Sequence, residues 1–420
     1  MAAVAALALV GTAACSNGGS NSSSSSSEKI PSKITKKTTV VFWNAMPGVQ
    51  GSTLKQLTNE FEKKNPKINV KLENQGAYND LQAKINSTLQ SPNNLPTITQ
   101  AYPGWLWNAA QNKMLVNMTP YINDKNVGWG SAKASGIRTE LLDGAKIKGT
   151  QYGIPFNKSI ETLTYNADMF KKYGIKKVPT TMEELKQVSE TIYKKSNHKV
   201  VGAGFDSLSN YYTLGLKNEG VNFSDKVNFS GAASKKVINY YADGIKKGYF
   251  RVAGSEHYLS GPFMFIGTSA GEGFVKQGVG NKFTYDVAPR PGKYTMQQGT
   301  DIYMFNHATA DQKAAAFKYI KFLVSKSSQL KWANATGYIP VNESVVTSSE
   351  YKNNKSTKLP AKLEDSMKHL YSVPVSKNSN AAYQQLNSIM QNILSAAQKG
   401  QNVNSQINAG KQKFDAAWKQ

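Results

Sequence analysis

The sequence predicts an α/β protein of two lobes, because of its length and of one recurring pattern. A chain of 420 residues exceeds the size at which a single hydrophobic core usually stops growing, so two lobes are favoured over one. From Thr38 onward, short β-rich runs alternate with segments that carry apolar residues at helical spacing. Strands that alternate with helices in this way form a parallel sheet covered by helices.

The N-terminal segment precedes the predicted fold. Residues 1–15 are small and apolar, end in the only cysteine, Cys15, and are too short to span a bilayer, which takes about twenty residues. They resemble a bacterial lipoprotein signal, with TAAC as the lipobox and Cys15 as the lipidated residue. Thr12 stands where Leu is usual, and no basic residue precedes Lys29. A start codon assigned too far downstream explains the second departure; an apolar helix with an incidental cysteine is the alternative.

The stretch after Cys15 is rich in Gly, Ser and Asn. Residues 16–29 read SNGGSNSSSSSSEK, a composition that buries no apolar area and behaves as a flexible coil. We therefore expect a tether over residues 16–37 between the N-terminal segment and the folded body.

The first predicted elements form a βαβαβ unit. Apolar residues at helical spacing, such as Leu54, Leu57 and Phe61, define its helices, and Asn65-Pro66 ends the first of them. The strands are expected at 39–43, 68–72 and 96–101, and the helices at 52–63 and 79–90. Further strands are expected at 163–165, 263–266 and 301–305, further helices at 182–194 and 311–325, and the last hundred residues are expected to be mainly helical.

The loops after three predicted strands supply a candidate binding cleft. Open parallel sheets bind ligands at the carboxyl ends of their strands, which here are followed by residues 44–51, 102–107 and 267–271. Asn44 and Tyr102 lie in these loops, beside tryptophans. Aromatic faces next to amide and hydroxyl groups suit a polyol or a sugar. For any single aromatic residue, a place in the core is the alternative.

Composition excludes several classes of protein. The net charge of +24 comes from dispersed lysines with only three arginines, which argues against nucleic-acid binding. Such a surface also suits attachment to an anionic cell surface, so a basic adhesin is one alternative. The single cysteine and four isolated histidines offer no metal-binding pattern. No glycine-rich dinucleotide loop is present, so we expect neither metal nor cofactor.

One motif points to catalysis. The segment PFMFIGTSAGEGF (residues 262–274) contains GTSAG, which matches the G-x-S-x-G nucleophile elbow and would make Ser269 a nucleophile. Such an enzyme also needs an acid and a histidine downstream. His307 lies just before a predicted helix and His369 in a segment of helical character, and neither context is that of a catalytic histidine. A secreted serine esterase that uses Ser269 is therefore the alternative from another class.

Several segments carry a family resemblance. VVFWNAMPG (40–48), NEFEKKNPKINV (59–70), GIPFNKSIETLTYNADMFKKYGI (153–175) and ATGYIPVNES (335–344) resemble the extracellular solute-binding family 1 of ABC importers. The resemblance implies a two-lobed periplasmic-binding-protein-like fold with an interlobe ligand cleft. It also implies hinge closure around a solute, delivery to the transmembrane subunits of an ABC permease, a monomer, and no enzymatic activity.

Within the family the chain is most similar to sn-glycerol-3-phosphate-binding proteins. Their ligand positions fall on residues of the second-strand loop, the PFN segment, the small-residue loop, the late strand and the TGY segment, namely Tyr78, Ser159, Thr268, Ser269, Gly299 and Tyr338. A glutamate position of those proteins is occupied by Pro103. The place of their phosphate-binding arginine falls in residues 380–386, where we find only amides. The resemblance therefore implies glycerol-3-phosphate or a glycerophosphodiester, with a maltodextrin-like oligosaccharide as the alternative.

The resemblance also implies a domain division. We expect a signal peptide at 1–15, a tether at 16–37, a first lobe at 38–158 and 298–345, and a second lobe at 159–297 and 346–420. The expected location is the outer face of the cell membrane, with a lipid anchor at Cys15.

Overall fold

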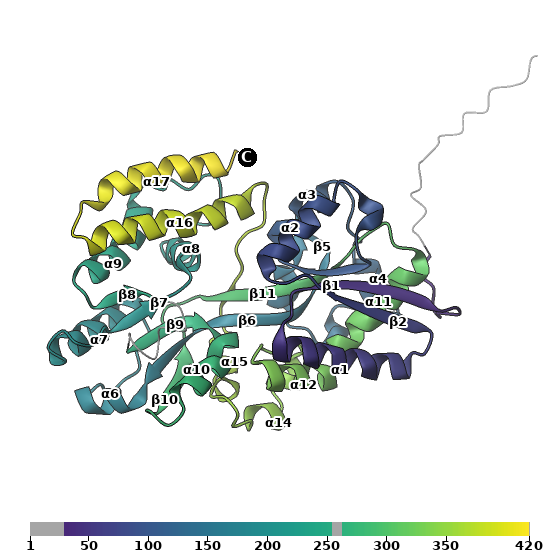
Figure 1. The fold of residues 1–420 in the computed structure, drawn as a ribbon, viewed down its shortest axis with the longest axis horizontal. Coiled ribbons are helices and arrows are strands. Elements are labelled where there is room, and N and C mark those ends of the chain that lie inside the picture. The colour runs from purple at the N-terminus through teal and green to yellow at the C-terminus, as the bar shows by residue number, and fades with distance from the viewer. Residues whose placement is uncertain (1–28, 254–262, 420) are drawn as a thin grey trace, which may run out of the picture.

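Two strands that run from one lobe to the other organise the fold, β6 (Gly153–Asn166) and β11 (Thr295–Met304) (Figure 1). The computed structural model describes residues 29–253 and 263–419. The expected signal peptide, Cys15 and residues 16–28 of the expected tether lie outside the described residues. Both strands belong to one ten-stranded sheet with the order β2-β1-β3-β11-β6-β9-β7-β8, to which β10 and β12 add at β6 and β11.

The first lobe contains the predicted βαβαβ unit. Its strands are β1 (Thr38–Asn44), β2 (Ile68–Asn74) and β3 (Ile98–Ala101), and its helices are α1 (Gly48–Lys64) and α2 (Tyr78–Thr88). β1 pairs in parallel with both β2 and β3, which confirms the predicted parallel arrangement. β11 lies antiparallel to β3 and joins this unit to β6.

The second lobe is built on the other half of β6. Around it lie β7 (Ala203–Phe205), β8 (Phe250–Val252), β9 (Met264–Thr268) and β10 (Tyr285–Pro289). β9 and β10 pair antiparallel with β6, and β7 pairs in parallel with β8 and β9. The partner of β6 changes at one point. Residues up to Ile160 pair with β11, and residues from Glu161 onward pair with β9.

The longer helices cover the sheet in both lobes. They are α6 (Ala167–Tyr173), α7 (Met182–Lys195), α8 (Leu208–Asn218), α9 (Ala232–Lys246), α10 (Glu272–Val279), α11 (Ala310–Leu323), α12 (Lys326–Thr336), α16 (Ser379–Gln398) and α17 (Val403–Ala417). Short elements connect them: η1 (Pro92–Asn94), η2 (Pro103–Leu106), α3 (Trp107–Gln111), α4 (Thr119–Asn123), η3 (Lys133–Ser135), α5 (Thr139–Gly144), β4 (Lys146–Ile147), β5 (Thr150–Gln151), η5 (Ser269–Gly271), α13 (Glu343–Val346), α14 (Ser349–Lys352), η6 (Leu359–Ala361), α15 (Leu363–Ser366) and β12 (Leu370–Tyr371). None of the helices within residues 29–253 and 263–419 is long and apolar enough to cross a bilayer.

The predicted elements are confirmed, but β6 is much longer than expected. The sequence indicates a strand only at 163–165, whereas β6 has 14 residues, all but one of them buried. A strand that is buried on both faces lacks the alternation of apolar and polar residues by which a strand is recognised. The neighbours that bury β6 come from both lobes.

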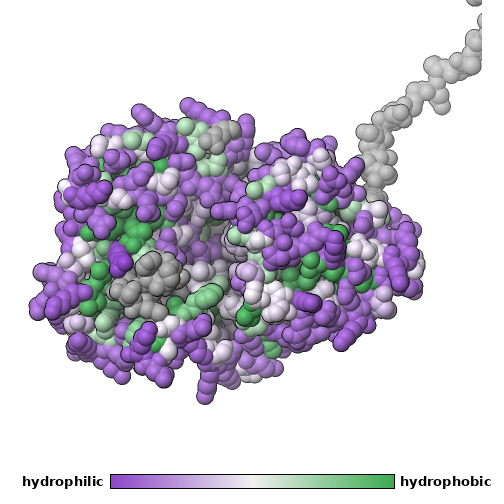
Figure 2. Space-filling view, in the orientation of Figure 1, coloured by the Kyte–Doolittle hydropathy of each residue, from purple (hydrophilic) through white to green (hydrophobic). Residues whose placement is uncertain are grey.

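Each lobe has its own hydrophobic core. The core of the first lobe draws on residues between 40 and 156 and between 302 and 341. The core of the second lobe draws on residues between 163 and 266 and on α16 and α17. Figure 2 shows a largely hydrophilic surface that is hollowed where the two lobes meet. The C-terminal helices α16 and α17 therefore pack in the second lobe, beside α8 and α9 (Figure 1).

Two buried ion pairs flank the point where β6 changes partner. Lys158 donates to Asp301 on β11 at 3.0 Å and to the Gly299 carbonyl at 2.9 Å. Arg290 donates to Glu161 at 2.8 Å. The four side chains are at most 3% exposed, so each charge depends on its partner.

We predict that Lys158→Met destabilises the protein by about 3–5 kcal/mol, because it leaves the Asp301 carboxylate buried without a cation. Urea unfolding monitored by circular dichroism measures this loss. Lys158→Met combined with Asp301→Asn is expected to regain most of the stability. Lys146→Met, which removes the exposed pair with Asp143, is the matched control and should cost less than about 1 kcal/mol. A Lys158→Met protein as stable as the control would contradict the prediction.

Candidate functional site

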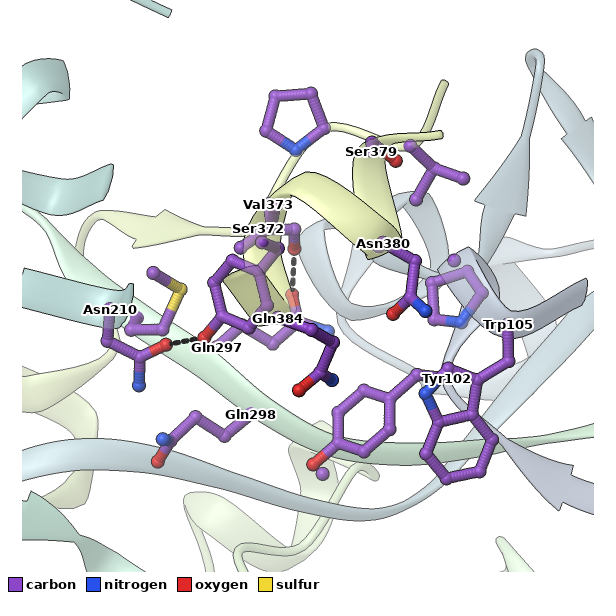
Figure 3. A pocket seen from close by; sticks show the side chains of 18 of the residues that line it. Tyr102, Trp105, Asn210, Gln297, Gln298, Ser372, Val373, Ser379, Asn380 and Gln384 are labelled. Atoms are coloured by element: carbon purple, nitrogen blue, oxygen red, sulfur yellow. Dashed lines mark hydrogen bonds between the residues drawn. The ribbon is translucent and has the colours of Figure 1, made fainter. Parts of the chain in front are cut away.

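A cavity of about 320 Å³ lies between the lobes, within the range of about 300–1,000 Å³ typical of small-molecule sites. α2, η2 and the connecting strands form one side, and α8, α16 and residues 372–375 form the other. In Figure 3 the side chain of Gln384 points into the cavity, between Asn210 on one side and Tyr102 and Asn380 on the other. The expected interlobe cleft is thus present.

Aromatic side chains form the wall contributed by the first lobe. Tyr78, Tyr102 and Trp105 contact one another edge to face, with ring centroids 5.2–6.0 Å apart. The Tyr78 hydroxyl lies 3.5 Å from the Tyr338 hydroxyl and accepts from the Asn157 amide at 3.3 Å. Burial raises the pKa of both Tyr78 and Tyr102 above the usual tyrosine range, so both hydroxyls stay neutral and available for hydrogen bonds.

The local sequence explains the place of this wall. Pro103 starts η2 directly after Tyr102, where its fixed φ suits the first helical position. Gly104 faces α16, and a Cβ there would meet that of Asn380 at 3.3 Å. The absence of a side chain at Gly104 lets the two lobes approach each other at this end of the cavity.

Gly299 brings backbone to the cavity. Its φ is +83°, and a Cβ at this position would lie 2.1 Å from the Asn157 carbonyl oxygen. Only glycine adopts this conformation without strain and leaves space for β6. Gly299 thereby lines the cavity with its backbone, next to the aromatic wall.

The cavity wall carries little charge. Lys158 is the only charged side chain among the described residues that line it, and its ammonium group is bound to Asp301 and to the Gly299 carbonyl. Burial raises the pKa of Asp301, and Lys158 opposes this rise. Lys158 is therefore not a free phosphate-binding point charge. The remaining polar groups of the wall are amides and hydroxyls.

Two glutamines in β11 present incompletely paired amides. Gln297 and Gln298 line the cavity, and the Gln297 Nε2 and Gln298 Oε1 atoms are buried without a hydrogen-bond partner. The other end of Gln297 accepts from the Ser372 hydroxyl at 2.7 Å. Buried polar atoms without partners are costly, so a polar solute is expected to stabilise this wall.

The second lobe contributes helix ends and a buried network. Ser379 and Asn380, in the first turn of α16, line the cavity. Further along this helix, Tyr383 donates from its hydroxyl to Asn210 Oδ1. Asn210 Nδ2 in turn donates to Glu161 at 2.8 Å. The Arg290–Glu161 pair is thereby connected to the cavity surface.

The structure brings together part of the expected site. Tyr78, Tyr102 and Gly299 line the cavity, and Tyr338 reaches it through its contact with the Tyr78 hydroxyl. Asn44 is buried and caps its own turn, since it accepts from the Met46 amide at 3.3 Å and donates to the Phe42 carbonyl. The part of Asn44 in solute binding remains a prediction.

The remaining expected residues form a separate cluster where β9 meets β6. The Thr268 hydroxyl donates to that of Ser159 at 3.1 Å, and Ser269 Oγ accepts from the Ile160 amide at 3.1 Å. Ser159, Thr268 and Ser269 are not among the residues that line the cavity, and their contact with a solute remains a prediction.

Among the described residues, this region shows no catalytic arrangement. The Ser269 hydroxyl is bound to a backbone amide, while His307 contacts the Pro96 carbonyl and His369 the Tyr294 ring. Glu272 accepts hydrogen bonds from the Lys358 and Leu359 amides and from Tyr285, so it does not face the cavity. Nothing here favours the esterase alternative.

Sequence reasoning missed most of the wall formed by the second lobe. Ser207 and Asn210 flank the start of α8, and Tyr383 and Gln384 lie on α16. No local motif marks them, since they meet only when α8 and α16 pack together. The pair Gln297-Gln298 before Gly299 was the one available signal, because two amides in a buried strand require partners. Within the described ranges, no group of His, Cys, Asp and Glu side chains is arranged to hold a metal ion.

The two lobes with a polar cavity at their junction have the architecture expected of a solute-binding protein. The family model for the bacterial extracellular solute-binding protein matches residues 56–361. This match covers more than half of the chain, and the chain belongs to this family.

Individual relatives agree with this assignment. The sn-glycerol-3-phosphate-binding periplasmic protein UgpB of Salmonella typhimurium is 23% identical over 334 residues, which make up 72% of this chain and 74% of that protein. UgpB from Mycobacterium tuberculosis in complex with glycerophosphocholine has a TM-score of 0.76 at 17% identity and covers 91% of this chain and 98% of its own. The ABC substrate-binding protein Lmo0181 from Listeria monocytogenes, in complex with cycloalternan, has a TM-score of 0.75 at 18% identity. The match covers 91% of this chain and 99% of that protein.

An acidic residue lies directly behind the cavity wall. Asp206 follows β7 and precedes Ser207, which lines the cavity. The Tyr211 oxygen is 2.6 Å from the Ile266 carbonyl and 2.9 Å from Asp206 Oδ1. A tyrosine has one proton to donate, so both short contacts are satisfied when Asp206 is protonated. Burial, with the nearby Glu161 charge, raises the pKa of Asp206 to about 7.

We predict that Asp206→Asn becomes increasingly stable relative to wild type as the pH rises. The raised pKa means that the contribution of protonated Asp206 is complete below about pH 4 and is lost as the pH rises through about 7. Between pH 5 and 8 the free-energy difference should grow by about 3 kcal/mol. Urea unfolding at several pH values measures it, with exposed Asp225→Asn as control. A difference that does not vary with pH would contradict the prediction.

Proposed function

We propose that this protein captures a glycerophosphodiester between its lobes, closes around it, and delivers it to an ABC permease. The observation that carries the choice of solute is the charge of the wall, because Lys158, the one cation among its described residues, is bound to Asp301. A phosphate monoester with about two negative charges would lack a compensating partner. A diester has a single charge, which suits the N-terminal turn of α16.

The rest of the cavity fits the glycerol part of such a solute. Amides of Gln297, Gln298 and Gln384 offer donors and acceptors to hydroxyl groups. Tyr78 and Tyr102 present hydroxyls beside ring faces, which suit the apolar face of a polyol. The glycerophosphocholine bound by the Mycobacterium tuberculosis neighbour supports this class of solute.

A saccharide is the second candidate. The aromatic cluster of Tyr78, Tyr102 and Trp105 and the shortage of charge favour a neutral sugar equally well. The cavity volume lies at the lower end of the usual range, so this solute would be short.

Closure would occur about the connecting strands. β6 and β11 cross between the lobes, and β12 adds to the start of β11. We also propose boundaries between the lobes near residues 158–159, 297–298 and 345–346. The two separate cores support the first two of them, whereas Val345 and Val346 belong to a further apolar cluster that contacts both lobes. Hinge movement about a few strand residues is a usual route of domain closure.

We predict that glycerophosphocholine raises the melting temperature of residues 28–420 and that sn-glycerol 3-phosphate raises it less. Ligand at 100 times its Kd adds about 2.7 kcal/mol. Maltose and maltotriose are the saccharide arms of the same experiment. Tyr102→Ala should abolish the shift, while Phe274→Ala, which removes an exposed aromatic side chain outside the cavity, should keep it. If none of these four compounds raises the melting temperature of wild type, the proposed solute class is wrong.

We further propose that the mature protein is anchored to the outer face of the cell membrane by a lipid on Cys15, followed by the tether. Two observations support this proposal: the sequence pattern around Cys15 and the extracellular character of the family.

We predict that the protein expressed in its own host incorporates an alkyne analogue of palmitate and fractionates with the membrane. Cys15→Ser should lose the label and appear in the medium, because the acceptor thiol is gone. Ser20→Ala, in the same segment, is the control and should stay labelled. Label retained by Cys15→Ser would refute the lipid anchor.

A further inference from the structure

A buried chain of hydrogen bonds leads from an ion pair in the second lobe to the cavity. It starts at Arg290, which donates to Glu161 at 2.8 Å, and both side chains are at most 1% exposed. Glu161 next accepts from Asn210 Nδ2 at 2.8 Å. Tyr383 then donates its hydroxyl proton to Asn210 Oδ1. The last two residues line the cavity.

The chemistry of the groups sets the direction of every bond in this chain. A guanidinium only donates, so Glu161 beside it remains a carboxylate, which only accepts. Burial raises the pKa of Glu161, and the Arg290 charge opposes that rise. The Asn210 amide must therefore turn its nitrogen toward Glu161 and its oxygen toward Tyr383. Because an amide oxygen cannot donate, the proton of Tyr383 is committed to Asn210.

The consequence reaches the cavity surface. Once its proton is committed, the Tyr383 oxygen has only lone pairs left for a solute. Burial raises the pKa of Tyr383 above the usual tyrosine range, so the hydroxyl keeps this proton.

We infer that the Arg290–Glu161 pair acts through Asn210 to make Tyr383 a hydrogen-bond acceptor, and that Tyr383 selects for a solute hydroxyl and against a phosphate oxygen. Arg290, Glu161 and Asn210 are positioning residues, and Tyr383 is the specificity-determining residue. The inference rests on the proposed function, since it requires a solute in this cavity. Asn210 and Asn380 lie on opposite sides of the cavity (Figure 3), so the hydroxyl end of the solute faces α8 and any charged group faces the start of α16.

The decisive experiment changes the hydroxyl of Tyr383 without removing it. Incorporation of 3-fluorotyrosine at position 383 makes the hydroxyl a stronger donor and a weaker acceptor. Titration calorimetry with glycerophosphocholine and with maltose measures Kd for each. We expect Kd for the bound probe to rise about threefold, which corresponds to a fraction of the free energy of one hydrogen bond. 3-Fluorotyrosine at position 240, whose hydroxyl donates to Met182 outside this cavity, is the control and should leave Kd unchanged.

A second variant tests the positioning chain itself. Asn210→Leu removes the acceptor of the Tyr383 proton, which frees the hydroxyl to donate to the solute. In this background 3-fluorotyrosine at position 383 is expected to tighten binding instead of weakening it. A residue with a merely structural role would not reverse the sign of the fluorine effect. Tyr383→Phe in the wild-type background should weaken binding about tenfold.

The outcomes separate the inference from the proposed function. Binding of a probe by wild type, with weaker binding on fluorination of Tyr383, supports both. Binding by wild type, with tighter or unchanged binding on fluorination, overturns the inference and leaves the proposed function intact. Absence of binding by wild type for both probes overturns the proposed function and the inference together. The protein with 3-fluorotyrosine at position 383 and no other change tests the inference even if Asn210→Leu does not fold.

Discussion

The structure depends on one strand that changes partners while it remains buried. β6 pairs with β11 up to Ile160 and with β9 from Glu161 onward. One half of the strand therefore belongs to the sheet of the first lobe and the other half to that of the second. At this point two charges of opposite sign, Lys158 and Glu161, are buried on the same strand and paired with Asp301 and Arg290. A buried ion pair tolerates little displacement of its partners. The pairs therefore hold β6 against β11 and against the segment that directly follows β10.

The same constraint shapes the cavity. Because Lys158 is bound to Asp301 and to the Gly299 carbonyl, its charge is not available to a solute, and the wall is left with amides, hydroxyls and aromatic rings. Because Glu161 is bound to Arg290, it orients Asn210 and through it Tyr383. The two ion pairs thus supply rigidity below the cavity and hydrogen-bond direction at its surface, and both favour selective binding of a solute.

Local patterns were enough to predict much of the fold. The first three strands and two helices follow from apolar spacing and from stops such as Asn65-Pro66, and they form the expected parallel unit. The length of β6 did not follow, since its burial by both lobes removes the alternation that marks a strand. Of the expected site residues, Tyr78, Tyr102 and Gly299 line the cavity. Asn210, Tyr383 and Gln384 could not be predicted, because they lie on separate helices with no shared motif.

The sequence by itself determined the class of fold, the family resemblance and the aromatic side of the cleft, because periodicity, stop signals and short motifs are local properties of the chain. The segment GTSAG shows the limit of that information. Its serine matches a nucleophile motif, yet in the folded chain Ser269 accepts a hydrogen bond from the Ile160 amide. Only the tertiary structure decided which charges are paired, which amides face the cavity and which way their protons point. These properties depend on contacts between residues as far apart in the chain as Glu161 and Arg290.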